Sequence, residues 1–289
     1  MTKTKTYDKG KAIWCAGCGH FGAKNAIQFA MESAGIEMHE ALVLAGIGCS
    51  GTVQNNIGAY GYHSMHGRVV PTAVGASLAN PNLTVIAAGG DGDGYAIGGG
   101  HFMHALKRNP NILYVVMNNG VYGLTKGQDS PTREEPGVAP EECAFDAMML
   151  GLSIQSSTFL ARAITTRSEQ LNSLLVQGLE HVRAGQGMAF VEVLSPCVTY
   201  HDTYPQWLNQ VHDVDQDPDY PADNRGRAFG HICSMVDEGR IPIGKIYTGK
   251  HKSLQASIMG AVSPFESLDE SNRVPTREHL DKVIAAYTV

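Results

Sequence analysis

The chain has 289 residues, of which 43% are hydrophobic and 17% charged, and its formal net charge is −6. This composition indicates a globular protein with a large core, and the acidic balance argues against nucleic-acid or anionic-membrane partners. Because no apolar run is as long as a transmembrane helix and no apolar signal core follows the basic N-terminal residues, we expect a cytoplasmic protein, whose six cysteines are free thiols or metal ligands.

Helix-like and strand-like segments alternate from the N-terminal region to about residue 196. Helices are predicted at residues 22–34, 71–79, 96–108, 140–150 and 168–183, and strands at 41–45, 83–88, 112–117, 158–163 and 188–194. Alternation of this kind favours an α/β fold, in which a mostly parallel sheet carries helices on both faces.

Residues 200–227 have a different texture, because they are polar, rich in proline and without periodicity. We expect a long arm here that wraps a partner or covers a site, since structureless loops of this length are uncommon inside compact domains. A last helix is predicted at residues 276–287. The predicted organisation is an α/β domain over residues 1–199, followed by a C-terminal arm and terminal helix over residues 200–289 that contact another subunit.

A Gly-Asp-Gly turn at residues 90–92 follows one predicted strand, and Asn118-Asn119 ends the next. The helix between them forms a crossover, so the strands are parallel and both carboxyl ends reach the edge where ligands bind. Such a turn alone is most often structural, but oxygen ligands held among glycines suit a magnesium ion that carries a diphosphate. The pattern resembles the thiamine diphosphate signature, with residues 93–117 as its spacer.

Four cysteines lie in loops that the predicted topology brings toward one end of the sheet. Cys15 and Cys18 form a CxxC in a glycine-rich loop, whereas Cys49 and Cys197 each follow a predicted strand. Four such thiolates can bind a [4Fe-4S] cluster. The spacing alone leaves open a structural zinc, a redox-active CxxC or simple packing of small side chains.

Taken together, these segments resemble the β subunit of the 2-oxoacid:ferredoxin oxidoreductases, the subunit that binds thiamine diphosphate. The resemblance rests on residues 14–22, 46–51, 63–68, 90–99, 118–132 and 195–200, which read WCAGCGHFG, GIGCSG, HSMHGR, GDGDGYAIGG, NNGVYGLTKGQDSPT and SPCVTY. It implies a thiamine-diphosphate-binding fold over residues 1–199 that also holds one [4Fe-4S] cluster. The implied reaction is coenzyme A-dependent oxidative decarboxylation of a 2-oxoacid with reduction of ferredoxin, or the reverse reductive carboxylation.

The resemblance also implies roles for individual residues. The cluster ligands would be Cys15, Cys18, Cys49 and Cys197, and the Mg²⁺ ligands Asp91, Asn119 and the carbonyl of Val121. Cofactor contacts are expected from Gly48, Cys49, Ser50, His66, Gly67, Arg68, Gly90, Asp91, Gly92, Asp93, Asn119, Val121, Tyr122, Gly123, Leu124 and Thr125. His66 is in addition a catalytic candidate, with a satisfied core histidine as the alternative.

Thiamine enzymes usually activate the cofactor with a glutamate from a partner surface, which the resemblance places on an α subunit. We therefore expect the chain to be active only as an αβ or (αβ)₂ assembly. Lys126 is a second catalytic candidate, because an unpaired lysine near a closed site is costly and a second substrate carboxylate would pair with it. This favours 2-oxoglutarate as the substrate and succinyl-CoA as the product.

Several alternatives to this interpretation stay open. Lys126 would otherwise be a solvated surface lysine. The chain would then belong to an enzyme for pyruvate or for a broad range of 2-oxoacids. A third alternative is a non-catalytic iron–sulfur subunit that only transfers electrons.

Overall fold

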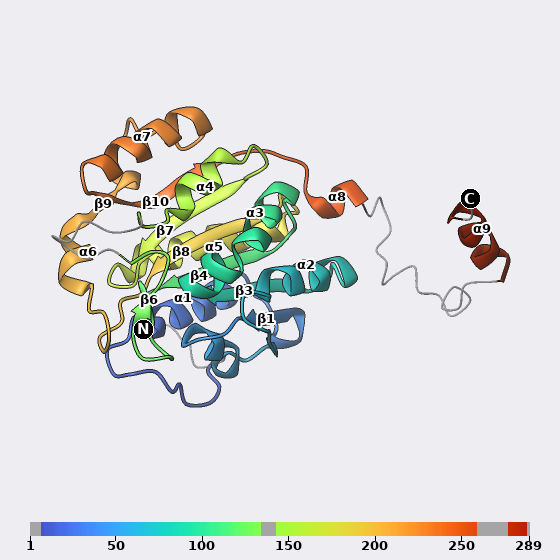
Figure 1. The fold of residues 1–289 in the computed structure, drawn as a ribbon, viewed down its shortest axis with the longest axis horizontal. Helices are drawn as coiled ribbons and strands as arrows, with labels where there is room; N and C mark the ends of the chain where they lie inside the picture. Colours follow the sequence, from blue (N-terminus) through green and yellow to red (C-terminus); the bar gives the residue numbers. More distant parts are fainter. Residues whose placement is uncertain (1–6, 134–142, 259–276, 288–289) are drawn as a thin grey trace.

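The computed structural model describes residues 7–133, 143–258 and 277–287, and its centre is an eight-stranded sheet (Figure 1). The strand order is β2-β1-β3-β4-β8-β7-β10-β9. These strands are Ala41–Ala45 (β1), Tyr60–His63 (β2), Thr84–Gly90 (β3), Leu113–Asn118 (β4), Phe159–Ile164 (β7), Ala189–Leu194 (β8), Val211–Asp213 (β9) and Ile241–Thr248 (β10). Neighbouring strands pair in parallel except β10 and β7, which are antiparallel. The predicted mostly parallel α/β fold is confirmed.

Helices cover both faces of this sheet (Figure 1). Helices α1 (His20–Ser33) and α5 (Ser168–Arg183) pack on one face, where Ile27 and Leu175 join the apolar core. The other face is covered by α2 (Val69–Ala79), α3 (Gly99–Arg108), α4 (Ala147–Ser153) and α7 (Arg225–Asp237). Because both faces are buried, the central strands are near-continuous apolar runs, which is why they could be recognised from the sequence. No helix in the described ranges is both long and apolar enough to cross a membrane.

Two predicted helices begin later than expected, whereas α1 and α2 begin two residues earlier than predicted. The helix predicted at 96–108 is preceded by a π-helical turn, Gly92–Ile97, and α3 itself begins at Gly99. The helix predicted at 140–150 begins only at Ala147, and residues 140–142 lie outside the described residues. Its start is set by Asp146, whose carboxylate accepts hydrogen bonds from the backbone N–H groups of Met148 and Met149.

The expectation of a structureless arm at residues 200–227 is wrong. This segment contains α6 (Tyr204–Gln210), β9 and the start of α7, and Trp207 is buried. Asn224 caps α7, since its side chain accepts a hydrogen bond from Arg227 N at 3.1 Å. Strands β9 and β10 belong to the main sheet although they lie beyond residue 199. The division of the chain at residue 199 and the contact of its C-terminal part with another subunit stay predictions.

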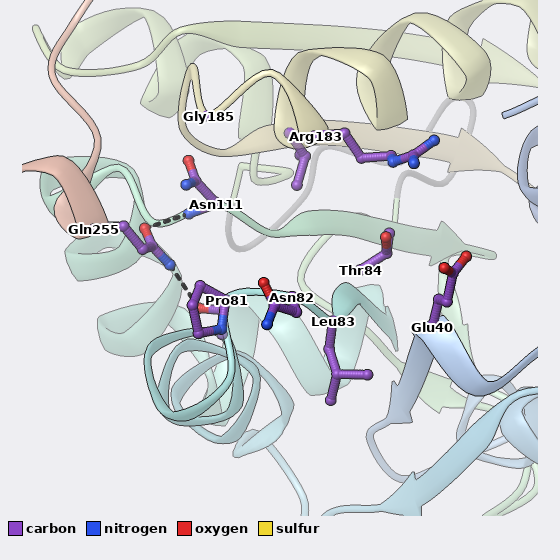
Figure 2. Close-up of a pocket in the computed structure, with 11 residues that line it drawn as sticks. Glu40, Pro81, Asn82, Leu83, Thr84, Asn111, Arg183, Gly185 and Gln255 are labelled. Carbon is purple, nitrogen blue, oxygen red and sulfur yellow. Dashed lines mark hydrogen bonds between the residues drawn. The ribbon is translucent and has the colours of Figure 1, made fainter. Parts of the chain in front are cut away.

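The C-terminal residues add two short helices. The predicted last helix is confirmed as α9 (Arg277–Tyr287), which lies apart from the sheet in Figure 1. Helix α8 (Leu254–Ile258) docks at the amino edge of the sheet through the buried Gln255 (Figure 2). The side chain of Gln255 accepts a hydrogen bond from Asn111 N at 2.8 Å and donates one to Ser77 Oγ at 3.0 Å.

The same edge contains a polar cavity of about 260 Å³. Glu40 and Arg183 are the charged side chains among the described residues that line it, and the remaining lining residues are neutral (Figure 2). Arg183 already donates a hydrogen bond to the carbonyl of Ala34 at 2.7 Å. None of the predicted site residues lines this cavity. Most of them line another cavity, at the carboxyl edge of the sheet.

Candidate functional site

The loops that follow β1, β3 and β4 enclose a cavity of about 290 Å³ at the carboxyl edge of the sheet. Its lining comprises His20, Ile47, Gly48, Cys49, Ser50, His66, Gly90, Asp91, Gly92, Asp93, Met117, Asn119, Val121, Tyr122, Gly123, Leu124 and Thr125. The predicted cofactor contacts thus come together here, with the exception of Gly67 and Arg68. Their contact with a cofactor remains a prediction.

Gly67 and Arg68 contact other parts of the protein. The backbone N–H of the buried Gly67 donates to Asp93 Oδ1 at 2.8 Å. The Arg68 guanidinium is exposed and lies against the His101 ring on α3. Partial burial, together with the Arg68 charge, lowers the pKa of His101.

Asp91 follows β3 directly and is 2% exposed. Its Oδ2 accepts hydrogen bonds from the hydroxyls of Ser130 and Thr132, at 2.5 and 2.7 Å. Burial raises the pKa of the Asp91 carboxyl, and the two hydroxyls partly oppose this rise. A cation beside the carboxylate would favour its ionised form.

The Asn119 amide lies between Asp91 and the Val121 carbonyl. A terminal atom of the Asn119 amide lies 3.2 Å from Asp91 Oδ1 and 2.8 Å from the Val121 carbonyl oxygen. With the amide oxygen on this side, three oxygens converge, whereas the amide nitrogen there would donate to both acceptors. The oxygen-inward orientation needs a cation between the three groups. This donor set fits Mg²⁺, which prefers hard oxygen ligands.

Asp93 connects three segments around the cavity. Its Oδ1 accepts hydrogen bonds from the backbone N–H groups of Ile47 at 2.9 Å and Gly67 at 2.8 Å, and lies 3.0 Å from His66 Nδ1. A Cβ at Gly46 would lie 2.0 Å from Asp93 Oδ2, so only glycine allows this close approach. Asp93 therefore fixes His66 at the margin of the cavity, where the ring remains half-buried.

A second cavity of about 190 Å³ contains the predicted cluster ligands. Cys15, Cys18, Cys49 and Cys197 all line it. Burial, with smaller contributions from the other three cysteines, raises the pKa of Cys18 to about 11. Such thiols need a metal to be deprotonated at neutral pH.

The spacing of the cysteines bears on the kind of metal. Within the described ranges, no group of three His, Cys, Asp or Glu side chains is arranged to hold a metal ion. The four thiolates that bind a four-iron cluster lie farther apart than the ligands of a single metal ion, because each thiolate binds a different iron. Four cysteines around one cavity are the number of thiolate ligands that a four-iron cluster takes.

Hydrogen bonds hold the three cysteine loops together. Trp14 Nε1 donates to the carbonyl of Cys49 at 2.7 Å, and Gly19 N donates to the carbonyl of Pro196 at 3.0 Å. A Cβ at Gly19 would lie 2.4 Å from the Ser195 backbone, which explains the glycine after the CxxC.

His20 lines the larger cavity and was not among the predicted site residues. It is 1% exposed, and its Nδ1 lies 3.0 Å from Ser195 Oγ. Burial lowers the pKa of His20 to about 4, so the ring is neutral at pH 7. The available sequence signal is its position two residues after the last cysteine of the CxxC motif.

Lys126 lines the cysteine cavity rather than the larger one. It lies between β5 (Val121–Tyr122) and β6 (Gln128–Asp129), and its φ is +84°. This left-handed conformation costs a residue with a side chain about 1 to 2 kcal/mol. Burial raises the pKa of Cys49, and the positive charge of Lys126 partly opposes this effect.

Comparisons with known proteins agree with this geometry. Residues 46–193 match the family described as "Thiamine pyrophosphate enzyme, C-terminal TPP binding domain". The 2-oxoacid:ferredoxin oxidoreductase subunit β of Saccharolobus solfataricus is 35% identical over 267 residues, which cover 87% of this chain and 86% of that protein. The 2-oxoglutarate synthase subunit KorB of Methanothermobacter thermautotrophicus is 37% identical and covers 65% of this chain and 66% of its own.

A solved structure is similar over the whole chain. It is the 2-oxoglutarate:ferredoxin oxidoreductase from Magnetococcus marinus with 2-oxoglutarate, coenzyme A and succinyl-CoA bound. The TM-score is 0.82 at 31% identity, and the match covers 100% of this chain and 97% of that one. The family predicted from the sequence is confirmed: this chain belongs to the β subunits of the 2-oxoacid:ferredoxin oxidoreductases, which are thiamine diphosphate enzymes.

Proposed function

We propose that the substrate is 2-oxoglutarate, which the enzyme converts with coenzyme A to succinyl-CoA and CO₂ while ferredoxin is reduced, or the reverse. The observation that carries this proposal is Lys126, a cation in a strained backbone conformation beside the cysteine cavity. Its side chain is exposed rather than close to a closed site, so the expected pairing rests on its charge and position and not on the cost of burial. It lies two residues from Leu124, which lines both cavities. A second substrate carboxylate would pair with this charge, and the relative and the solved structure named for 2-oxoglutarate support the same assignment.

The larger cavity would hold the cofactor. Asp91, Asn119 and the Val121 carbonyl would bind Mg²⁺, and the backbone N–H groups of Gly92 and Asp93 would face the diphosphate at the start of a helical turn. When bound, thiamine diphosphate supplies the nucleophilic carbon and the electron sink that loss of CO₂ requires. His66, oriented by Asp93, is the proposed proton-transfer group beside it.

The cysteine cavity would hold one [4Fe-4S] cluster, bound by Cys15, Cys18, Cys49 and Cys197. Cys49 also lines the larger cavity, so the cluster and the cofactor would be close neighbours. Cys15 is exposed, which would bring the cluster near the surface where ferredoxin binds. The acyl group would then pass to coenzyme A after the electrons have left.

The chain is proposed to work with an α subunit, as αβ or (αβ)₂, in the cytoplasm. Asp91 and Asp93 are the carboxylates among the described residues lining the larger cavity, and both already accept several hydrogen bonds. The glutamate that activates the cofactor would therefore come from the partner.

The test is to purify the chain with its α subunit under anaerobic conditions and to compare substrates. We expect iron, sulfide and thiamine diphosphate to copurify, and kcat/KM for 2-oxoglutarate to exceed that for pyruvate by about tenfold or more. Equal values for the two oxoacids would favour the broad-specificity alternative. A cluster without thiamine diphosphate would favour an electron-transfer subunit instead.

A further inference from the structure

A chain of buried polar side chains leads from the interior of the sheet to the predicted metal ligands. It begins at Arg162 on β7, which is 4% exposed, and at its cross-strand neighbour Glu192 on β8, which is 1% exposed. Arg162 Nε donates to Glu192 Oε2 at 2.5 Å, and its Nη2 donates to Asp146 Oδ2 at 2.9 Å. Both carboxylates are thereby held in place by one guanidinium.

The second oxygen of Glu192 orients an amide on the neighbouring strand. Glu192 Oε1 accepts hydrogen bonds from Tyr95 OH at 2.8 Å and from Asn118 Nδ2 at 3.0 Å. Asn118 is the last residue of β4 and is buried. A carboxylate that is fixed by two other donors dictates which end of the Asn118 amide faces it.

The other end of this amide contacts both parts of the predicted Mg²⁺ site. Asn118 Oδ1 accepts a hydrogen bond from Gly120 N at 3.1 Å, in the turn that presents Asn119 and Val121. It also lies 2.8 Å from Thr132 Oγ1, and this hydroxyl lies 2.7 Å from Asp91 Oδ2. One buried side chain thus contacts the supports of all three predicted metal ligands.

A rotation of the amide by 180° would break these contacts. The amide nitrogen would then face the Gly120 N–H, and the amide oxygen would face the Glu192 carboxylate. Both encounters are repulsive, because they place donor against donor and acceptor against acceptor. Glu192 and Arg162 therefore prevent the alternative orientation.

Stability alone gives little reason for this arrangement. A buried ion pair often contributes no more to folding than apolar side chains of similar volume, whereas fixing one of several arrangements is a better-attested role. Side chains that hydrogen-bond to metal ligands commonly set the metal affinity. On the basis of the proposed function, we propose that Asn118, oriented by Glu192 and Arg162, is the positioning residue for the Mg²⁺ that carries thiamine diphosphate.

The test compares Asn118→Asp with the wild-type αβ complex. This variant keeps the size and the oxygen that faces Gly120 and Thr132, but it replaces the donor to Glu192 by a second anionic oxygen. We expect the apparent Kd for Mg²⁺, read from thiamine diphosphate binding by calorimetry, to rise about 10- to 100-fold. Saturating Mg²⁺ should restore most of the turnover rate, because the positioned ligands are still present.

Thr132→Val supplies a second variant, in which no new charge is buried. Thr132 is half-buried, and valine keeps its shape while removing the hydroxyl between Asn118 and Asp91. Its Kd for Mg²⁺ should also rise. Wild-type Mg²⁺ affinity in Thr132→Val, or in a folded Asn118→Asp, overturns the inference.

A matched control separates metal positioning from general destabilisation. Thr158 is buried near the opposite edge of the sheet, where its hydroxyl donates to Asn109 Oδ1 at 2.9 Å. Thr158→Val should lower the melting temperature and leave the Kd for Mg²⁺ unchanged. An equal loss of Mg²⁺ affinity in this control overturns the positioning role. Absence of Mg²⁺-dependent cofactor binding in the wild type would instead contradict the proposed function.

Discussion

Trp14 Nε1 donates a hydrogen bond of 2.7 Å to the carbonyl of Cys49, and so joins the CxxC loop to the loop after β1. The indole also packs edge-on against His20 and Phe21, at ring-centroid distances of 5.6 and 5.2 Å. A single side chain therefore holds together two loops that carry three of the four predicted cluster ligands. This hydrogen bond should therefore help to retain the proposed cluster.

Trp14→Phe should keep the aromatic packing and lose only the hydrogen bond, which is worth about 1 kcal/mol. We expect the anaerobically purified αβ complex to fold and to lose its iron several times faster than the wild type on exposure to air. The measurement is the decay of the cluster absorbance together with iron content. An unchanged decay rate would mean that the indole hydrogen bond does not govern cluster retention.

Lys126→Ala tests the substrate assignment. Loss of the charge should raise KM for 2-oxoglutarate about tenfold, equivalent to about 1.4 kcal/mol, and change KM for 2-oxobutyrate much less. Lys126→Gly distinguishes charge from backbone strain, since glycine accepts the φ of +84° without cost. Its stability should exceed that of Lys126→Ala, while its substrate profile should be the same. Equal KM changes for both oxoacids would contradict the pairing with a second carboxylate.

Gly92→Ala should damage the cofactor cavity. A Cβ at this position would lie 2.2 Å from a ring carbon of Tyr122, and overpacking of this kind costs about 1 to 3 kcal/mol. We expect thiamine diphosphate binding to weaken by about tenfold or more, as measured by calorimetry. Gly100→Ala is the control, because nothing lies within 4 Å of its Cβ and alanine favours the helix. Equal binding by both variants would rule out the predicted obstruction.

The buried His181 should make the protein sensitive to acid. Burial lowers its pKa to about 4, whereas an unfolded histidine has a pKa of about 6.5. Below pH 6.5 the unfolded chain therefore binds a proton that the folded chain does not. The contribution of this residue is fully present above pH 6.5 and falls by about 1.4 kcal/mol per pH unit as the pH decreases toward 4.

His181→Gln should reduce this pH dependence by about one proton. The measurement is urea unfolding of the complex at pH 5 and pH 7. Thr158→Val is the control, because it removes the hydroxyl that lies 3.0 Å from His181 Nε2 and leaves the titrating ring in place. The idea fails if the stability difference between the two pH values is the same in His181→Gln and in the wild type.

The sequence predicted correctly those elements whose burial is visible as an apolar pattern. The buried strands of the parallel sheet and α5 were recognisable because apolar periodicity decides their burial. Residues 200–227 gave no such signal, since their order comes from an asparagine cap, short helical turns and the burial of Trp207. Local polar contacts of this kind need the three-dimensional neighbours before they can be interpreted.

The site residues, too, were predictable where strand order determines their position and unpredictable where a buried polar contact does. The residues around the Gly-Asp-Gly turn could be brought together from strand order alone, because parallel strands end at one edge. Arg162 and Glu192 lie within otherwise apolar strands, where a charged residue indicates a buried partner but not which one. The pairing itself depends on register between β7 and β8, which no single sequence specifies.

Cys49, Asn119, Gly123 and Leu124 each border both cavities. Under the proposed function, one short segment therefore takes part in both substrate choice and electron transfer. Substitutions in residues 119–124 that admit a larger oxoacid will also alter the surroundings of the thiols. Each variant with a changed substrate range should therefore be tested for its redox properties as well.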